Sequence, residues 1–348
     1  MPTRSLLFVA GTALLAVAPV AAQQRGRTIP RTPDGRPDLQ GNWTNATLTP
    51  IERPAGRGPI LTAAEAAAVE GRRRTQLDSL SQRSDPNRPA PPKGGVYIGD
   101  PQFDAASGGT GGYNVFFIDA GDRIAVINGE ARSSLITRPA NGRVPPLTAA
   151  ARARQTSVFA QYADFSNPEN RPLAERCILS FGSNAGPPML PNYFYNNNYT
   201  IVQTRDHVVI HTEMVHDTRI IRIGEGPRLP SQVRQYMGDS RGRWVGDTLV
   251  IETTNINPAQ AATLYGASSE MRVVERLSRI DARTLYYRFT VEDPASFAEP
   301  WGGEVPFRRL DDQIYEYACH EGNYALSNVL SGARDEERRK TEKPPDER

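Results

Sequence analysis

The feature that most limits the possible fold is a series of short alternating segments between residues 199 and 319. In segments such as TLVIETT and TLYYRFTVED, apolar and polar residues alternate with the period of two that is typical of half-buried β-strands. Short polar turns, including VGD, DAR and LDD, join these segments. Such turns connect antiparallel neighbours, because a parallel pair needs a long crossover. The pattern therefore predicts a mainly β protein with an antiparallel meander of about eight strands or more.

The meander is expected to close into a barrel, because closure removes the exposed edge strands of an open sheet. The last expected strand, residues 313–320, is followed by one apolar helical face made of Leu326, Val329, Leu330 and Ala333. A meander followed by a packing C-terminal helix is the architecture of calycins, the lipocalin-like proteins. A β-propeller is the alternative, but the sequence shows no repeat at a blade-like period of about 40 to 50 residues.

The N-terminal part of the chain differs from the meander in composition. Residues 1–22 are expected to be a cleaved signal peptide, because Arg4 precedes the apolar run SLLFVAGTALLAVA and small residues lead up to Ala22. A retained N-terminal anchor is the alternative, although the run is short for a membrane span. Residues 23–110 are rich in Pro and Gly. They are expected to form an extended arm around the main domain, with a disordered segment as the alternative.

Helices are expected at two places before the meander, besides the C-terminal helix. Thr62 and Glu65 form a capping box ahead of AAEAAAVE, and a second helix is expected to start near Thr148. Between these helices, YNVFFID and RIAVING are expected to pair as a hairpin, and SSLITRP to add a strand. The barrel domain with its C-terminal helix is then expected over residues 111–335, followed by a charged tail, residues 336–348.

The charge balance of the chain limits the classes of partner. There are 41 Lys and Arg against 39 Asp and Glu, a formal net charge of +2. The sequence has no basic stripe for nucleic acid and no polybasic patch for a membrane surface. After the signal peptide, no segment is apolar enough to cross a bilayer. We therefore expect a periplasmic or secreted protein with a small molecule as its partner, and the oligomeric state is left open.

The chain has two cysteines, Cys177 and Cys319. An exported protein meets an oxidising compartment, so we expect a disulfide bond between them. The bond would close a long loop and, in the chain-entropy model, would stabilise the folded protein by about 4 to 5 kcal/mol. Two buried free thiols are the alternative.

Three of the four histidines lie in HVVIHTEMVHDTR, residues 207–219. Residues two apart on a strand share a face, so His207, His211 and Glu213 are expected to lie together, with His216 on the other face of a regular strand. The shared face points to solvent if the barrel core is apolar, and into the barrel if the barrel holds a ligand. The sequence is compatible with both orientations. We expect no metal or other cofactor; if a metal is present, His211 and Glu213 are its candidate ligands.

Two segments place a histidine beside a carboxylate, which is the minimum that proton transfer requires. VHDTR contains His216 and Asp217, and ACHEGNY contains His320 and Glu321; these four are the candidate catalytic residues. Glu275 and Arg276 are adjacent and therefore lie on opposite strand faces, so one of the two charged side chains enters the barrel and must be paired. Asp217 and Glu321 are possible salt-bridge partners of Arg276. The candidates for binding polar substrate atoms are Arg219, Asp239, Arg241, Arg276 and Tyr317.

Several stretches taken together resemble a family of exported proteins of soil and aquatic Gram-negative bacteria. They are PDGRPDLQGNW, ERCILSFGSNAGPPMLP, EMVHDTRII, MGDSRGRWVGDTLVIETTN, VVERLSRID and YEYACHEGNY. The family has no assigned activity, so the resemblance implies a bacterial envelope protein and implies no catalytic residues.

The expected function is that of a small-molecule enzyme with acid/base chemistry, of the hydrolase, lyase or isomerase type, in a barrel pocket. The alternative is a non-catalytic periplasmic binding protein for an apolar or aromatic ligand, for which PPMLPNYFYNNNYT could supply stacking faces. A structural envelope protein whose N-terminal arm docks a partner is a third possibility.

Overall fold

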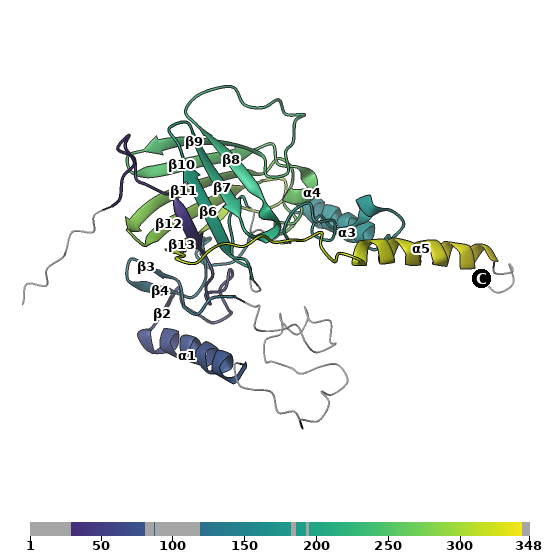
Figure 1. Ribbon diagram of the computed structural model, residues 1–348, viewed down its shortest axis with the longest axis horizontal. Coiled ribbons are helices and arrows are strands. Elements are labelled where there is room, and N and C mark those ends of the chain that lie inside the picture. The colour runs from purple at the N-terminus through teal and green to yellow at the C-terminus, as the bar shows by residue number, and fades with distance from the viewer. Residues whose placement is uncertain (1–28, 81–86, 88–118, 182–185, 193–194, 343–348) are drawn as a thin grey trace, which may run out of the picture.

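The computed structural model describes residues 29–80, 87, 119–181, 186–192 and 195–342, and a closed β-barrel lies at its centre (Figure 1). Nine strands form the wall, and pairing of β1 with β13 closes it. The mainly β barrel that the sequence predicts is thus confirmed. In order around the barrel, the strands are β1 (Gly41–Thr44), β6 (Asn198–Gln203), β7 (His207–Thr212), β8 (Thr218–Ile223), β9 (Asp239–Val245), β10 (Thr248–Thr254), β11 (Arg272–Asp281), β12 (Thr284–Glu292) and β13 (Trp301–Arg309).

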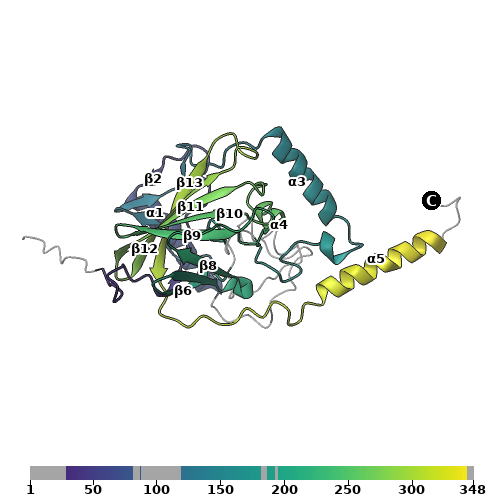
Figure 2. The ribbon, with the colours of Figure 1, turned by 90° about the horizontal axis from the view of Figure 1, so that it is seen from above.

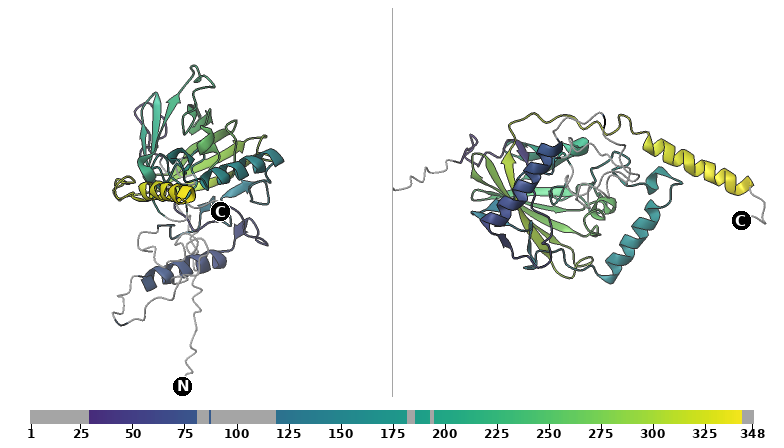
Figure 3. Two further views of the ribbon diagram at one scale, coloured as in Figure 1. Left: turned by 90° about the vertical axis from the view of Figure 1, so that its right-hand side faces the viewer. Right: turned by 90° about the horizontal axis from the view of Figure 1, so that it is seen from below.

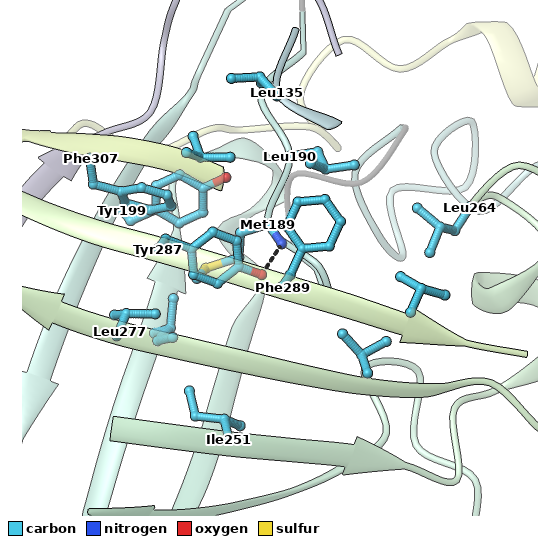
Figure 4. Packing of buried hydrophobic residues seen from close by; sticks show 14 of the residues in the cluster. Leu135, Met189, Leu190, Tyr199, Ile251, Leu264, Leu277, Tyr287, Phe289 and Phe307 are labelled. Carbon is cyan, nitrogen blue, oxygen red and sulfur yellow. Dashed lines mark hydrogen bonds between the residues drawn. The ribbon is translucent and has the colours of Figure 1, made fainter. Parts of the chain in front are cut away.

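Large side chains from the alternating strands fill the barrel interior (Figure 4). The ring centroids of Tyr199 and Phe307 lie 5.2 Å apart, and those of Tyr287 and Phe307 lie 5.5 Å apart. Trp43 of β1 is also fully buried. Burial of each such side chain contributes about 1.5–3 kcal/mol, so this packing explains why the alternating sequence closes around an apolar core.

One strand pair departs from the expected antiparallel meander. β8 and β9 run parallel, and their register joins Arg222 to Arg241 and Ile223 to Gly242. The chain between these strands, residues 224–238, is much longer than the tight turns elsewhere in the meander. Its length lets the chain return to the same end of the barrel before it enters β9, which a short turn cannot do.

Two segments near the chain ends also differ from the expectation. Residues 41–44, assigned to the arm, form β1, so the barrel draws a strand from outside the expected domain 111–335. Residues 313–320, expected as the last strand, form no strand, and Tyr315 there is 71% exposed. The reason is that β13 already pairs with β12 and with β1, so the alternation in this segment finds no strand to pair with.

The expected helices form, and their caps agree with the sequence. Thr62 and Glu65 make the capping box of α1 (Ala63–Leu80): the Thr62 amide donates to Glu65 Oε2 at 2.9 Å, and the Glu65 amide donates to Thr62 Oγ1 at 3.2 Å. The hydroxyl of Thr148 caps α3 (Ala149–Tyr162). A short helix, α4 (Pro258–Ala261), precedes β11.

A small second sheet lies between the barrel and α1 (Figures 1 and 3). It consists of β2 (Ile60–Leu61), β4 (Glu130–Arg132) and β3 (Val126–Ile127), while β5 (Ile136–Arg138) extends the main sheet from β13. RIAVING therefore pairs with the segment that follows it. Its expected partner YNVFFID lies outside the described residues except for Asp119.

The C-terminal helix α5 (Ala325–Glu342) forms but does not pack on the barrel as expected. Its apolar face is only half-buried, and the helix extends away from the barrel (Figure 2). Arg334 of α5 donates a hydrogen bond to the carbonyl of Ser166, close to the short 3-10 helix η2 (Pro168–Asn170). The helix also runs into the expected charged tail, residues 336–348.

The expected disulfide bond between Cys177 and Cys319 is present, with an S–S distance of 2.09 Å and Cα atoms 5.7 Å apart. It attaches the irregular segment after β13 to the segment that precedes β6. Within the described residues, no helix has the length and apolar character needed to cross a membrane. The expected signal peptide, residues 1–22, lies outside the described part of the chain.

Candidate functional site

A cavity of about 720 Å³ opens in the barrel wall where β8 and β9 diverge. The end of β8 pairs with β9 only through Arg222–Arg241 and Ile223–Gly242, so residues 218–221 of β8 have no partner on β9. The lining comes mainly from three segments, within residues 178–179, 217–222 and 234–240. A volume of this size is within the range of small-molecule sites, about 300–1,000 Å³. The long loop that makes the parallel pair possible therefore also creates the cavity.

Asp217 is the most unusual ionisable group of this cavity. Its carboxyl group is buried, and its Oδ2 accepts a hydrogen bond of 3.0 Å from the Ser180 amide. Burial disfavours the charged form and raises the pKa of Asp217 to about 7, although the bonds from Ser180 act in the opposite direction. Among the described residues, no cation forms an ion pair with it. A carboxyl group with this pKa can both accept and donate a proton near neutral pH.

The backbone before Asp217 explains how it reaches the cavity. In the 3-10 turn η3 (Met214–His216), Val215 and His216 have φ values of 57° and 48°, in the left-handed region that disfavours residues with a Cβ. The Thr212 amide donates to the Asp217 carbonyl at 2.8 Å across this turn. Such strain costs about 1–2 kcal/mol per residue and is often found at functional sites. The turn interrupts the strand alternation, so Asp217 is buried and His216 is exposed.

Asp239 is a second buried carboxylate of the same cavity, in a different environment. Its Oδ1 forms an ion pair with Arg222, and its Oδ2 accepts a hydrogen bond of 2.9 Å from the Leu229 amide. The two aspartates therefore differ in their partners, because Asp239 has a cation and Asp217 has a backbone amide. The two carboxyl groups of the cavity therefore lie in different electrostatic environments.

Arg219 reaches from the cavity into the barrel core. It forms a bidentate ion pair with Glu275, with Nη–Oε distances of 2.5 and 2.8 Å, and both side chains are almost fully buried. The Tyr287 hydroxyl donates to Glu275 at 2.8 Å and accepts from the Met189 amide at 2.9 Å (Figure 4). The Nε atom of Arg219 has no hydrogen-bond partner in the described part of the chain. This network fixes the inner end of Arg219.

The candidate catalytic histidines lie outside this cavity. His216 and His320 are exposed, as is Glu321, and none of the three lines the cavity. Of the four candidate catalytic residues, the structure brings only Asp217 into it. His320 follows Cys319, whose disulfide partner Cys177 precedes the lining residue Ile178, but His320 itself does not line the cavity.

The face that carries His207 and His211 looks outward, which settles the orientation that the sequence left open. His211 Nδ1 lies 2.9 Å from Thr218 Oγ1, and partial burial together with nearby His216 lowers the pKa of His211. The expected shared face does not extend to Glu213, which is buried and accepts a hydrogen bond of 2.8 Å from Asn198. No group of three or more potential metal ligands exists among the described residues.

The remaining candidate binding residues are divided between sites. Asp239 and Arg219 line the cavity, whereas Arg241 and Arg276 lie on the outer face of the sheet. The expectation that Arg276 pairs with Asp217 or Glu321 is wrong, because its neighbour Glu275 is the residue that enters the barrel and pairs with Arg219.

Tyr317, the last of the predicted binding residues, lies away from the cavity. Its ring stacks on Tyr195 with ring centroids 6.3 Å apart, and Phe181 meets Tyr195 edge-to-face.

Several lining residues were not selected from the sequence. Arg222, Arg234 and Tyr236 line the cavity, and His207 lies at its rim, opposite Arg222 in the register of β7 with β8. Arg234 donates to the Ser269 carbonyl at 2.6 Å and to Glu270 at 2.9 Å. For Arg234 and Tyr236 the only signal in the sequence is the length of the loop 224–238, which predicts an irregular segment without showing which of its side chains line a cavity.

Comparison of the chain with protein-family models and with curated proteins finds no match. The resemblance to exported Gram-negative proteins therefore stays a prediction, and the functional argument rests on the cavity.

Proposed function

We propose that the chain is an exported small-molecule enzyme that uses Asp217 as its proton-transfer group, in the cavity between β8 and β9. The observation that carries the proposal is the buried Asp217 carboxyl, which lines a 720 Å³ cavity with a pKa raised to about 7. Near neutral pH both of its forms are populated, which is the condition for efficient general acid/base catalysis. The reaction class is therefore hydrolysis, elimination or isomerisation.

The neighbouring groups have separate roles in this proposal. Asp239 forms an ion pair with Arg222, and this pair in the cavity lining binds polar atoms of the substrate. Ser240 shares a hydrogen bond of 2.8 Å with Thr253 at the buried end of β9 and holds that strand in place. His216 and His320 have no step in the proposal, because neither lines the cavity.

Export is part of the proposal and is supported by two observations. The first 22 residues have the charged, apolar and small-residue regions of a signal peptide, and the disulfide bond of Cys177 and Cys319 suits an oxidising compartment. A periplasmic location in a Gram-negative bacterium follows from the resemblance noted in the sequence.

The test is a search for turnover with a matched pair of variants. Small esters, lactones and carbonyl compounds with acidic C–H bonds are incubated with the protein in D₂O and followed by NMR, which detects both hydrolysis and proton exchange at carbon. Asp217→Asn is expected to lower turnover by about 100-fold or more. Glu169→Gln, at an exposed carboxylate that does not line the cavity, is the control. Turnover that survives Asp217→Asn unchanged would refute the proposal.

A second candidate function is non-catalytic binding of an apolar or aromatic ligand. A groove of about 670 Å³ between α3 and residues 262–270 favours it, and Phe159 at this groove is 63% exposed. The packed barrel interior does not favour the binding of such a ligand inside the barrel. Ligand binding that is unaffected by Asp217→Asn and abolished by Phe159→Ser would support this candidate.

A further inference from the structure

An arginine-rich groove of about 580 Å³ lies on the outer face of the barrel, apart from the cavity. Its lining includes six arginines and three glutamates, which leaves a formal charge of +3. The arginines are Arg138, Arg228, Arg241, Arg243, Arg272 and Arg276. A concave surface with this excess of guanidinium groups attracts anions and raises their local concentration.

Strand register explains both the hollow and its rim. One row across the sheet runs from Arg241 through Glu252, Val274, Thr290 and Gly302 to Arg138. Val274, Thr290 and Gly302 occupy the middle of this row, whereas Arg241, with Glu252 beside it, lies at one end and Arg138 at the other. The floor is therefore low in the centre and has guanidinium groups at both ends.

The neighbouring row adds an unfavourable charge arrangement. Arg243 and Arg276 both lie opposite Val250, and Arg276 lies opposite Arg288 on β12. Like charges directly opposite each other destabilise a sheet. An anion held between these side chains would offset that repulsion.

Some of the arginines form ion pairs with acidic residues, and others form none with the described residues. Arg272 forms ion pairs with Glu252 and Glu292, and Arg228 pairs with Glu252 at 2.6 Å. In contrast, Arg138, Arg243 and Arg276 form no ion pair or hydrogen bond with the described residues. These three line the groove and are the side chains available to a ligand.

We propose that this groove binds a small polyanion that carries two or more phosphate or carboxylate groups. Guanidinium groups bind both kinds of group through paired hydrogen bonds, and guanidinium groups at opposite ends of a hollow select a ligand with separated charges. Arg243 and Arg276 bind one end of the ligand, and Arg138 binds the other.

Isothermal titration calorimetry of the full chain with inorganic pyrophosphate and with citrate tests the proposal. Acetate and sodium chloride, at matched ionic strength, are the monovalent controls, because salt screens non-specific attraction. Saturable one-to-one binding is expected for at least one polyanion. Pyrophosphate alone would indicate phosphate ligands, and citrate alone carboxylate ligands.

Variants then assign the binding to the groove. Arg243→Gln and Arg276→Gln are each expected to weaken binding about tenfold, because each removes a charge-assisted contact. Arg143→Gln removes the same charge at an exposed position elsewhere and is expected to leave binding unchanged. If one groove variant does not fold, Arg138→Gln replaces it. The proposal is overturned if neither polyanion binds more tightly than the monovalent ions, or if Arg143→Gln weakens binding as much as the groove variants do.

Discussion

Replacement of Asp217 by Asn should change how the stability of the protein depends on pH. The pKa of Asp217 is raised from 3.8 to about 7 by burial, so the folded protein binds this proton more tightly than the unfolded chain does. Stability therefore falls as pH rises from about 4 to about 7 and does not fall further above that range. At about 1.4 kcal/mol per pKa unit, ionisation of the buried group costs about 4 kcal/mol at pH 8.

Asn removes this cost because it does not ionise, and its amide oxygen can still accept the hydrogen bond from Ser180. The difference in free energy of unfolding between Asp217→Asn and the wild type is thus expected to be about 4 kcal/mol larger at pH 8 than at pH 4. Urea unfolding followed by circular dichroism at the two pH values measures it. Titrations of all other groups are common to both proteins and cancel in the comparison.

Asp239→Asn is the matched control for this experiment. It removes a buried carboxylate that is paired with Arg222, and it is expected to destabilise the protein by about 1–3 kcal/mol at pH 8, since Arg222 is partly exposed. The two variants should therefore have opposite effects at pH 8. A stability difference for Asp217→Asn that is the same at both pH values would refute the raised pKa and the argument built on it.

Three further predictions concern the frame around the cavity. Replacement of Cys177 and Cys319 by Ser is expected to lower the free energy of unfolding by about 5 kcal/mol, because the bond joins residues 142 positions apart; an unchanged urea midpoint would contradict this. Glu275→Gln leaves the Arg219 guanidinium buried without a charge partner and is expected to lower the free energy of unfolding by about 3–5 kcal/mol. A loss below about 1 kcal/mol, which is typical of an exposed ion pair, would contradict the role of this buried pair. His216→Gly is expected to raise stability by about 0.5 kcal/mol and to keep any turnover, since His216 is exposed in the left-handed region; a loss of turnover would return this histidine to the mechanism.

The barrel could be predicted because alternation and tight turns are local properties of the sequence. Two features of the barrel could not be predicted in this way. β1 lies far from the other strands in sequence, and only closure against β13 and β6 selects it. The parallel pair β8–β9 depends on the path of the loop 224–238, which local patterns do not determine.

The candidate site was predicted only in part, for reasons that follow from backbone geometry. Asp217 and Asp239 were identified from their motifs. Periodicity could not show that a turn with two left-handed residues buries Asp217 and exposes His216. Similarly, the sequence required one member of the Glu275–Arg276 pair to enter the barrel, but only strand register shows that it is Glu275.

Titration of the Asp217 carboxyl carbon, followed by ¹³C NMR, measures the pKa on which the proposed role of this residue depends. The Asp217→Asn variant assigns the resonance by its disappearance. We expect a midpoint near pH 7, because the carboxyl group is buried in the cavity lining and forms no ion pair with the described residues. A midpoint near the ordinary value of 3.8 would show an ionised carboxylate at neutral pH and would contradict the proposed role of Asp217.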